Sequence, residues 1–169
     1  MFKKLSIAAA VASTMLLSLS ACEISINDDS IKGSGNIITE KREAASFDSI
    51  SNHSPFDIEL VVDGKTSVAV EGDDNFVKEV ETIVEGNTLV IRNKKKGRFH
   101  FAWKNSPTTV KISTAALVKV LNSGSGDMRL SQIKNEKLEI ISEGPGGIQA
   151  SGSSNELNFH ASGSGDVSL

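Results

Sequence analysis

The sequence predicts an all-β fold in which strands and hairpins lead into a β-solenoid (β-helix-like), with coils of about 20 residues. The first observation is a repeat, because Ser-Gly-Ser-Gly-Asp occurs at 123–127 and again at 162–166. A degraded copy, Glu-Gly-Pro-Gly-Gly, occupies 143–147, so equivalent glycines are separated by 20 and 19 residues. The second observation is the alternation of apolar and polar residues after each copy, which is the periodicity of a strand.

The expected strands of the solenoid follow its glycine corners. Three polar residues are each flanked by two apolar ones: Arg129 by Met128 and Leu130, Gln149 by Ile148 and Ala150, and Ser168 by Val167 and Leu169. Stacking places Met128, Ile148 and Val167 in one inward column, and Ile140 and Phe159, both buried, in another. Because one coil alone buries almost nothing, the core forms only by stacking. We expect the repeats to span about 110–169, with the corner glycines supplying positive φ.

The N-terminal half contains shorter strand patterns. We expect strands at 37–39, 47–51, 56–62, 68–71, 81–84 and 89–92. Asp63-Gly64-Lys65 and Gly86-Asn87 are typical of the turns of β-hairpins. A short helical turn that carries Phe76 and Val77 is expected after Asp73.

The first 32 residues indicate export and anchoring. Lys3 and Lys4 precede the apolar run 5–19, which is typical of a secretory signal. Leu19-Ser20-Ala21-Cys22 resembles the bacterial lipobox, and this resemblance implies cleavage before Cys22 and lipidation of its thiol. Two or more acyl chains hold a protein stably at a membrane. We therefore expect a signal peptide at 1–21, a lipidated tether at 22–32 and a single domain at 33–169; the alternative is an ordinary signal with an unrelated cysteine.

Composition argues against several function classes. The formal net charge is −3, and removal of Lys3 and Lys4 with the leader makes it −5, which gives no bias toward nucleic acid. Cys22 is the only cysteine, so no disulfide can form within the chain. The three histidines lack metal-ligand spacing, and no nucleophile elbow or phosphate-binding loop occurs. We expect no cofactor, no metal and no enzymatic activity.

One basic segment beside an aromatic strip is a candidate ligand site. Its residues are Lys94, Lys95, Lys96, Phe99, Phe101 and Trp103. The three aromatic residues alternate and would share one face of a strand, suited to a glycan or to anionic lipid headgroups. The alternative, which we favour, is a solvated loop whose aromatic residues cap one end of the solenoid.

The corner residues Asp127 and Asp166 are a second candidate site, for which three roles can be considered. Strand spacing would place them two coils, about 10 Å, apart. Such a pair suggests either the carboxylates of an inverting glycosidase or a calcium ladder. We favour a third account, in which each aspartate accepts hydrogen bonds at its own corner, because Gly147 interrupts the series of aspartates.

The order of several motifs resembles a known family. The motifs are Gly33-Ser34-Gly35-Asn36, Phe47-Asp48-Ser49-Ile50, Pro55-Phe56-Asp57-Ile58, Asn87-Thr88-Leu89-Val90-Ile91 and the Ser-Gly-Ser-Gly-Asp corners. Together they are similar to the bacterial head-GIN domain, described as a putative auto-transporter adhesin domain of unknown function. The resemblance covers about 33–169 and implies an all-β fold that ends in a solenoid on an exported protein.

These observations favour a non-catalytic lipoprotein of the cell envelope that works as a binding or adhesin-like module. We expect it at the outer membrane, facing the periplasm or the cell surface, with the membrane and a glycan or another envelope component as partners. The alternative is a structural scaffold element that self-associates at the C-terminal end of the solenoid; a polysaccharide-acting enzyme is the third option. Family members usually continue through further coils, so either the chain continues beyond Leu169 or another copy covers that end.

Overall fold

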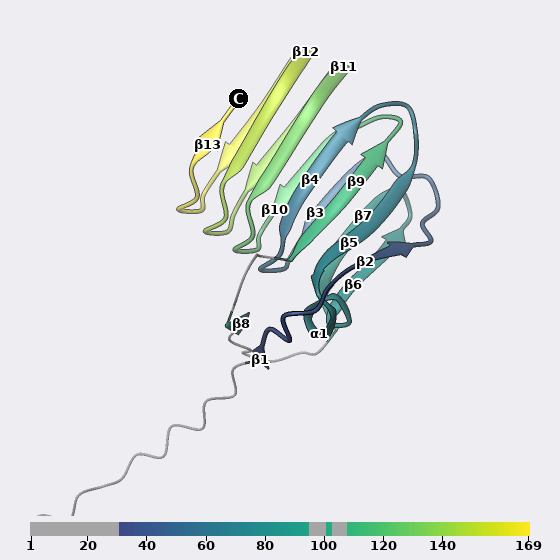
Figure 1. Ribbon diagram of the computed structural model, residues 1–169. Helices are drawn as coiled ribbons and strands as arrows, with labels where there is room; N and C mark the ends of the chain where they lie inside the picture. Colours follow the sequence, from purple (N-terminus) through teal and green to yellow (C-terminus); the bar gives the residue numbers. More distant parts are fainter. Residues whose placement is uncertain (1–30, 95–100, 103–107) are drawn as a thin grey trace, which may run out of the picture.

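The computed structural model describes residues 31–94, 101–102 and 108–169, and within these ranges the fold is all-β with one short helix (Figure 1). The elements are β1 (Ile31–Lys32), β2 (Ile37–Arg42), β3 (Ser49–Asn52), β4 (Asp57–Val62), β5 (Ser67–Asp73), α1 (Asp74–Val77), β6 (Val80–Glu85), β7 (Thr88–Asn93), β8 (Phe101–Ala102), β9 (Thr109–Thr114), β10 (Lys119–Asn122), β11 (Met128–Ser142), β12 (Ile148–Ala161) and β13 (Val167–Ser168). No helix in these ranges has the length and apolar character needed to cross a bilayer.

Eleven of the described strands belong to one sheet, which bends round until it is nearly closed, while β1 and β8 pair separately. Two parallel ladders make up most of it. The first ladder consists of β9, β4, the first part of β11, the first part of β12, and β13. The second ladder consists of β7, β3, β10 and the later parts of β11 and β12. The long strands β11 and β12 therefore serve both ladders, turning at Gln132, where φ is +57°, and at Gly152, where φ is +141°.

The core lies between the two ladders. In the first ladder, Ile58, Met128 and Ile148 are aligned and buried, and Val167 continues the column on β13. In the second ladder, Ile50, Val120 and Ile140 form the equivalent column. The alternation expected from the sequence is confirmed here, because Arg129 is exposed between two buried residues and Gln149 between buried Ile148 and half-buried Ala150.

The expected burial of Phe159 is wrong. Phe159 is aligned with Ile140, but it is 44% exposed whereas Ile140 is 0% exposed. Among the described residues, β12 pairs with β13 only at Ile148 and Gln149. The later part of β12 therefore has a neighbouring strand on one side only, and the side chain of Phe159 lacks a packing partner on the other.

The corner glycines are required for a different reason from the one expected. None of them has positive φ. A Cβ on Gly126 would lie 1.9 Å from the carbonyl oxygen of Phe56, and one on Gly146 would lie 2.2 Å from that of Gly126. Successive corners are thus stacked in direct backbone contact, which only a residue without a side chain allows.

The pairing of β4 differs from the hairpin expected around Gly64. The turn exists, with φ at +80° at Gly64, but β9 lies between β4 and β5 and pairs with both. The parallel stack also begins earlier than residue 110, because β3 and β4 belong to it. By contrast, the hairpin of β6 and β7 at Gly86-Asn87 and the short helix with buried Phe76 and Val77 are confirmed.

The N-terminal end of the stack is covered by antiparallel strands. Strand β5 pairs with β9 and with β2, and β6 pairs with β7. These strands and α1 lie at the end of the molecule opposite β12 and β13 (Figure 1). The two ends therefore differ, because antiparallel strands lie at one end and the parallel strands β12 and β13 lie at the other.

Candidate functional site

The outer face of the first ladder carries a column of exposed polar side chains. One residue from each of its five strands contributes: Lys111, Glu59, Arg129, Gln149 and Ser168. Adjacent strands are about 4.8 Å apart, so the column extends over about 20 Å. Every second residue of a strand points the same way, which is why these five side chains are exposed while most of their apolar neighbours are buried or half-buried. We call this surface the outer face of the first ladder.

An ion pair orders one edge of this face. The ammonium of Lys111 donates a hydrogen bond of 2.9 Å to Oε1 of Glu71 on β5, and Thr39 Oγ1 donates one of 3.1 Å to Oε2. The hydrogen bond from Lys111, with that from Thr39, lowers the pKa of Glu71 below its ordinary value. The same hydrogen bond raises the pKa of Lys111. Both groups are therefore charged near neutral pH.

A second column, at the corners, links successive coils through carboxylates. Oδ1 of Asp57 accepts a hydrogen bond of 3.0 Å from the backbone N–H of Asp127. In turn, Oδ1 of Asp127 accepts one of 2.8 Å from the backbone N–H of Gly147. Asp127, which was expected to accept a hydrogen bond at its own corner, thus bonds the corner that follows it in the stack. Within the described ranges, no three His, Cys, Asp or Glu side chains are grouped closely enough to hold a metal ion.

Gly147 leaves a notch in this corner column. The notch has a volume of about 200 Å³, and Asp127, Asp166, Arg129, Gln149 and Ser168 are among the residues that line it. It therefore lies where the corner column meets the column of exposed polar side chains, and both can contact a molecule placed there.

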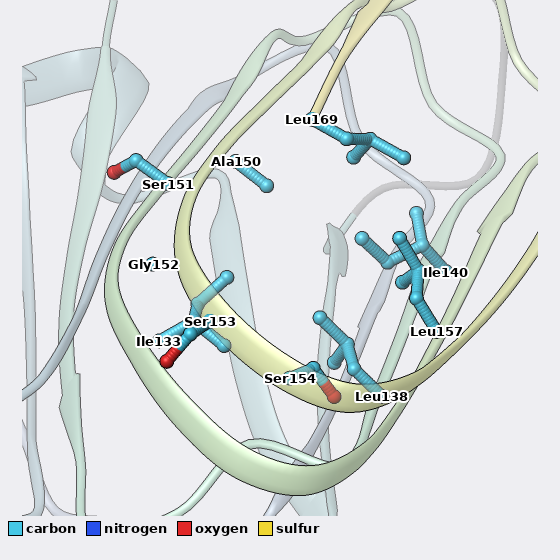
Figure 2. A pocket seen from close by; sticks show the side chains of 10 residues that line it. All are labelled: Ile133, Leu138, Ile140, Ala150, Ser151, Gly152, Ser153, Ser154, Leu157 and Leu169. Atoms are coloured by element: carbon cyan, nitrogen blue, oxygen red, sulfur yellow. The ribbon is translucent and has the colours of Figure 1, made fainter.

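An apolar hollow opens beside the outermost described coil. It has a volume of about 80 Å³ and lies between β11 and β12 and beneath Leu169. Figure 2 shows Leu138, Ile140 and Leu157 pointing into it. Leu157 and Leu169 are 45% and 54% exposed. The hollow is apolar and small, so it suits contact with other apolar side chains better than a polar ligand.

The site residues expected from the sequence are mostly outside this region. Lys94 is exposed just after β7. Phe101 begins β8, and its backbone pairs with that of Ile31. Lys95, Lys96, Phe99, Trp103 and the expected lipidation site Cys22 lie outside the described residues. The basic and aromatic site therefore stays a prediction.

Sequence reasoning found three of the five residues of the outer face. The alternation around Arg129, Gln149 and Ser168 placed these three residues outward. It missed Glu59 and Lys111, because their alignment with Arg129 depends on pairing of β4 with β9 and β11. A repeat search finds only the coils that share the Ser-Gly-Ser-Gly-Asp corner, and β4 and β9 do not follow such a corner.

Comparison with known proteins points to one family. A family model described as "Putative auto-transporter adhesin, head GIN domain" matches residues 46–169. A search of curated proteins gives no significant match.

Solved structures share the fold. A putative adhesin from Bacteroides fragilis NCTC 9343 has 26% sequence identity and a TM-score of 0.74, over 82% of this chain and 64% of that chain. A putative adhesin from Parabacteroides merdae ATCC 43184 has 20% identity and a TM-score of 0.67, over 82% and 58%. A putative lipid binding protein from Parabacteroides distasonis ATCC 8503 has 23% identity and a TM-score of 0.58, over 81% and 67%. This chain thus spans less than two thirds of the length of the first two.

Proposed function

Because the chain belongs to the head GIN domain family of putative auto-transporter adhesins, we propose that it is a non-catalytic binding module of the cell envelope. Its contact surface is the outer face of the first ladder. We further propose that the two ladders are a β-solenoid, since β11 and β12 each pass through both ladders and their corners recur after 20 residues. A lipid on Cys22 anchors the module at the outer membrane.

The observation that carries this function is the alignment of five exposed polar residues on adjacent strands. Side chains in such a column recur at about 4.8 Å along a rigid sheet, and each can donate or accept hydrogen bonds. A rigid polar surface of this kind contacts an extended polymer with little loss of side-chain freedom, since the backbone is already ordered. A polysaccharide of the envelope or of a neighbouring cell has the matching length and hydroxyl chemistry.

The position of the N-terminal strands supports the anchored arrangement. Strand β1 lies at the α1 end of the molecule, and β12 and β13 lie at the other (Figure 1). A tether formed by residues 22–32 spans at most about 40 Å when fully extended. An anchor at Cys22 would therefore hold the α1 end nearer the membrane and leave the β12–β13 end directed away from it.

The function is tested by changing the outer face and measuring binding. The full-length protein is applied to a glycan array and to bacterial envelope fragments, together with the triple variant Glu59→Ala, Arg129→Ala, Gln149→Ala. A matched control carries Lys119→Ala, Glu139→Ala and Asn158→Ala, which are aligned and on the outside of the second ladder. We expect the first variant to lose most of the binding and the control to keep it. No binding by the wild type, or equal binding by both variants, contradicts the proposal.

A second candidate function, self-association, is favoured by the open edge of β12. Leu157 and Phe159 of β12 are exposed, as is Leu169 beside Leu157, and Glu156, the one carboxylate of β12, is already paired with Lys137 at 2.8 Å. An open edge with few charges favours pairing with another chain. At the opposite end the path of the sheet finishes at the antiparallel strands β2 and β6, so that end differs from the edge of β12. Two copies that join through the same edge of β12 form a closed dimer and no filament.

Light scattering decides this second candidate. We expect the mass of the full-length protein to rise toward that of a dimer with concentration, and Phe159→Glu to keep it monomeric. A control substitution, Ser125→Glu, adds the same charge at an exposed corner and should leave the dimer intact. A wild-type protein that stays monomeric at high concentration contradicts self-association without affecting the first candidate.

A further inference from the structure

We infer that the notch at Gly147 is a subsite for one residue of a neutral sugar. The inference rests on the proposed function, because it assigns a ligand class and a position to the outer face of the first ladder. It starts from a glycine that neither the backbone nor the packing requires.

Gly147 differs from the other glycines of its corner. A Cβ on Gly144 or Gly146 would lie 2.1 Å or 2.2 Å from a backbone oxygen of the preceding coil. At Gly147 the nearest atoms would be the carbonyl oxygen of Asp166 at 3.1 Å and Oδ1 of Asp127 at 3.4 Å. Its φ also lies outside the left-handed region. A side chain would thus fit with a small adjustment, as it does at the equivalent positions of the neighbouring coils, which hold aspartates.

The consequence of this glycine is an open notch that two acidic residues line. Asp127 and Asp166 flank it from the coils on either side, and the notch that they bound has a volume of about 200 Å³. This is below the ~300–1,000 Å³ typical of pockets for drug-sized ligands. It provides room for one sugar ring, with the rest of a glycan lying along the outer face.

The side chains around the notch match the chemistry of a sugar. Carboxylates of Asp127 and Asp166 accept hydrogen bonds from hydroxyl groups. The guanidinium of Arg129 donates, and the carboxamide of Gln149 both donates and accepts. Hydroxyl groups on neighbouring ring carbons can satisfy an acceptor and a donor at the same time. Arg129 and Gln149 stand on strands held in register by the ladder, and Asp127 and Asp166 directly precede such strands, so their spacing is set before a ligand arrives.

The charge balance selects among sugars. Two carboxylates and one guanidinium leave the notch with a formal charge of −1, which repels uronic acids, sialic acids and phosphorylated sugars. A divalent cation would lack a third acidic ligand, since the described residues contain no group of three metal-binding side chains. A neutral hexose therefore fits better than an anionic sugar or a metal ion.

Filling the notch tests the inference. Binding of glucose, galactose, mannose and glucuronic acid to the full-length protein is measured by NMR, with the backbone amide of Gly147 and the Nε–H of Arg129 as probes. We expect at least one neutral hexose to shift these signals and glucuronic acid to leave them unchanged. The variants Gly147→Asn and Gly147→Asp should weaken the binding at least tenfold, with the Nε–H of Arg129 as their probe. The melting temperatures of both Gly147 variants should stay at or above that of the wild type. The new side chain can accept a hydrogen bond from the backbone N–H of the next corner, as Asp57 and Asp127 do.

Controls separate the loss of space from a change in charge or folding. Ser125→Asp adds the same charge at an exposed corner residue that does not line the notch, and it should bind like the wild type. Gln149→Ala removes a hydrogen-bonding group without filling the notch, and it should weaken binding even if the Gly147 variants fold poorly.

Three outcomes would overturn the inference. If both Gly147 variants or Gln149→Ala bind hexose as the wild type does, the notch is not the subsite. If the wild type binds envelope fragments but no neutral hexose, the ligand class is wrong and the proposed function stands. If the wild type binds neither, the proposed function fails together with the subsite.

Discussion

Inside the stack, Nδ2 of Asn52 donates a hydrogen bond of 3.0 Å to Oδ1 of Asn122, although the two residues are 70 positions apart in the sequence. Both are fully buried. Oδ1 of Asn52 also accepts hydrogen bonds from the backbone N–H and the hydroxyl of Ser54, at 3.0 Å and 2.6 Å. A buried polar group costs free energy unless it is hydrogen-bonded. This pair therefore favours the observed register, since a shift of one strand against the other breaks the hydrogen bond between the two amides.

Removal of the Asn122 side chain should strongly destabilise the fold. Its Nδ2 donates to the carbonyl oxygens of Gly126 and Gly146, both at 3.2 Å, so it joins the corners of two coils. Asn122→Ala removes the hydrogen bonds to these two carbonyl oxygens and to Nδ2 of Asn52, and each buried group left unsatisfied costs about 1–3 kcal/mol. We expect a loss of about 3 kcal/mol or more in urea unfolding. Asn158→Ala, at an exposed position of β12, should change stability by less than about 0.5 kcal/mol; equal losses would show that the buried network has no special role.

Aligned residues of the second ladder should differ in their contribution to stability. Ile140→Ala creates a cavity in the core and should cost about 2–5 kcal/mol. Phe159→Ala should cost clearly less, because Phe159 is 44% exposed. Arg129→Ala, at an outward position, should change the free energy of unfolding by less than about 0.5 kcal/mol. Urea melts of the three variants check the order, and a larger loss for Phe159→Ala than for Ile140→Ala would contradict it.

Acid should weaken the attachment of β5 to β9 through Glu71. The hydrogen bond from Lys111 lowers the pKa of Glu71 in the folded state, so the unfolded state binds a proton more readily. The contribution of Glu71 to stability is therefore complete above the unfolded pKa of about 4.3 and is lost as the pH falls through the folded pKa. We expect the urea midpoint of the wild type to fall more steeply below pH ~5 than that of Glu71→Gln.

Salt provides the control for this pH effect. Glu71 and Lys111 are both partly exposed, at 40% and 45%, so solvent screens their interaction and the difference between the two proteins should be small. It should shrink further in about 1 M NaCl, where the screening length is about 3 Å. Identical pH profiles at low salt would show that this ion pair does not stabilise the fold.

The proposed lipid anchor requires the thiol of Cys22. Cys22→Ser removes the group that lipidation requires, so the protein should leave the membrane fraction and escape lipoprotein-type processing. Fractionation with high-salt and carbonate washes, followed by mass spectrometry of the N-terminus, checks this. Because the outer face is separate from the anchor, the released variant should bind the same glycans as the wild type. A variant that stays in the membrane through both washes would contradict lipidation at Cys22.

The sequence by itself determined the local features of this protein. The alternation of apolar and polar residues identified the strands and their inward and outward faces, because side-chain direction depends only on position along a strand. The spacing of the corners set the length of a coil, since glycines are needed wherever corners stack in direct contact.

Only the tertiary structure decided which strands are neighbours. The insertion of β9 between β4 and β5 and the meeting of Asn52 with Asn122 join segments that are far apart in the chain. Alternation carries no information on the partner of a strand; the partner is selected by packing and hydrogen bonding of the whole stack. For the same reason the notch at Gly147 could not be predicted. Gly147 leaves a notch there because stacking places Asp127 and Asp166 on either side of it.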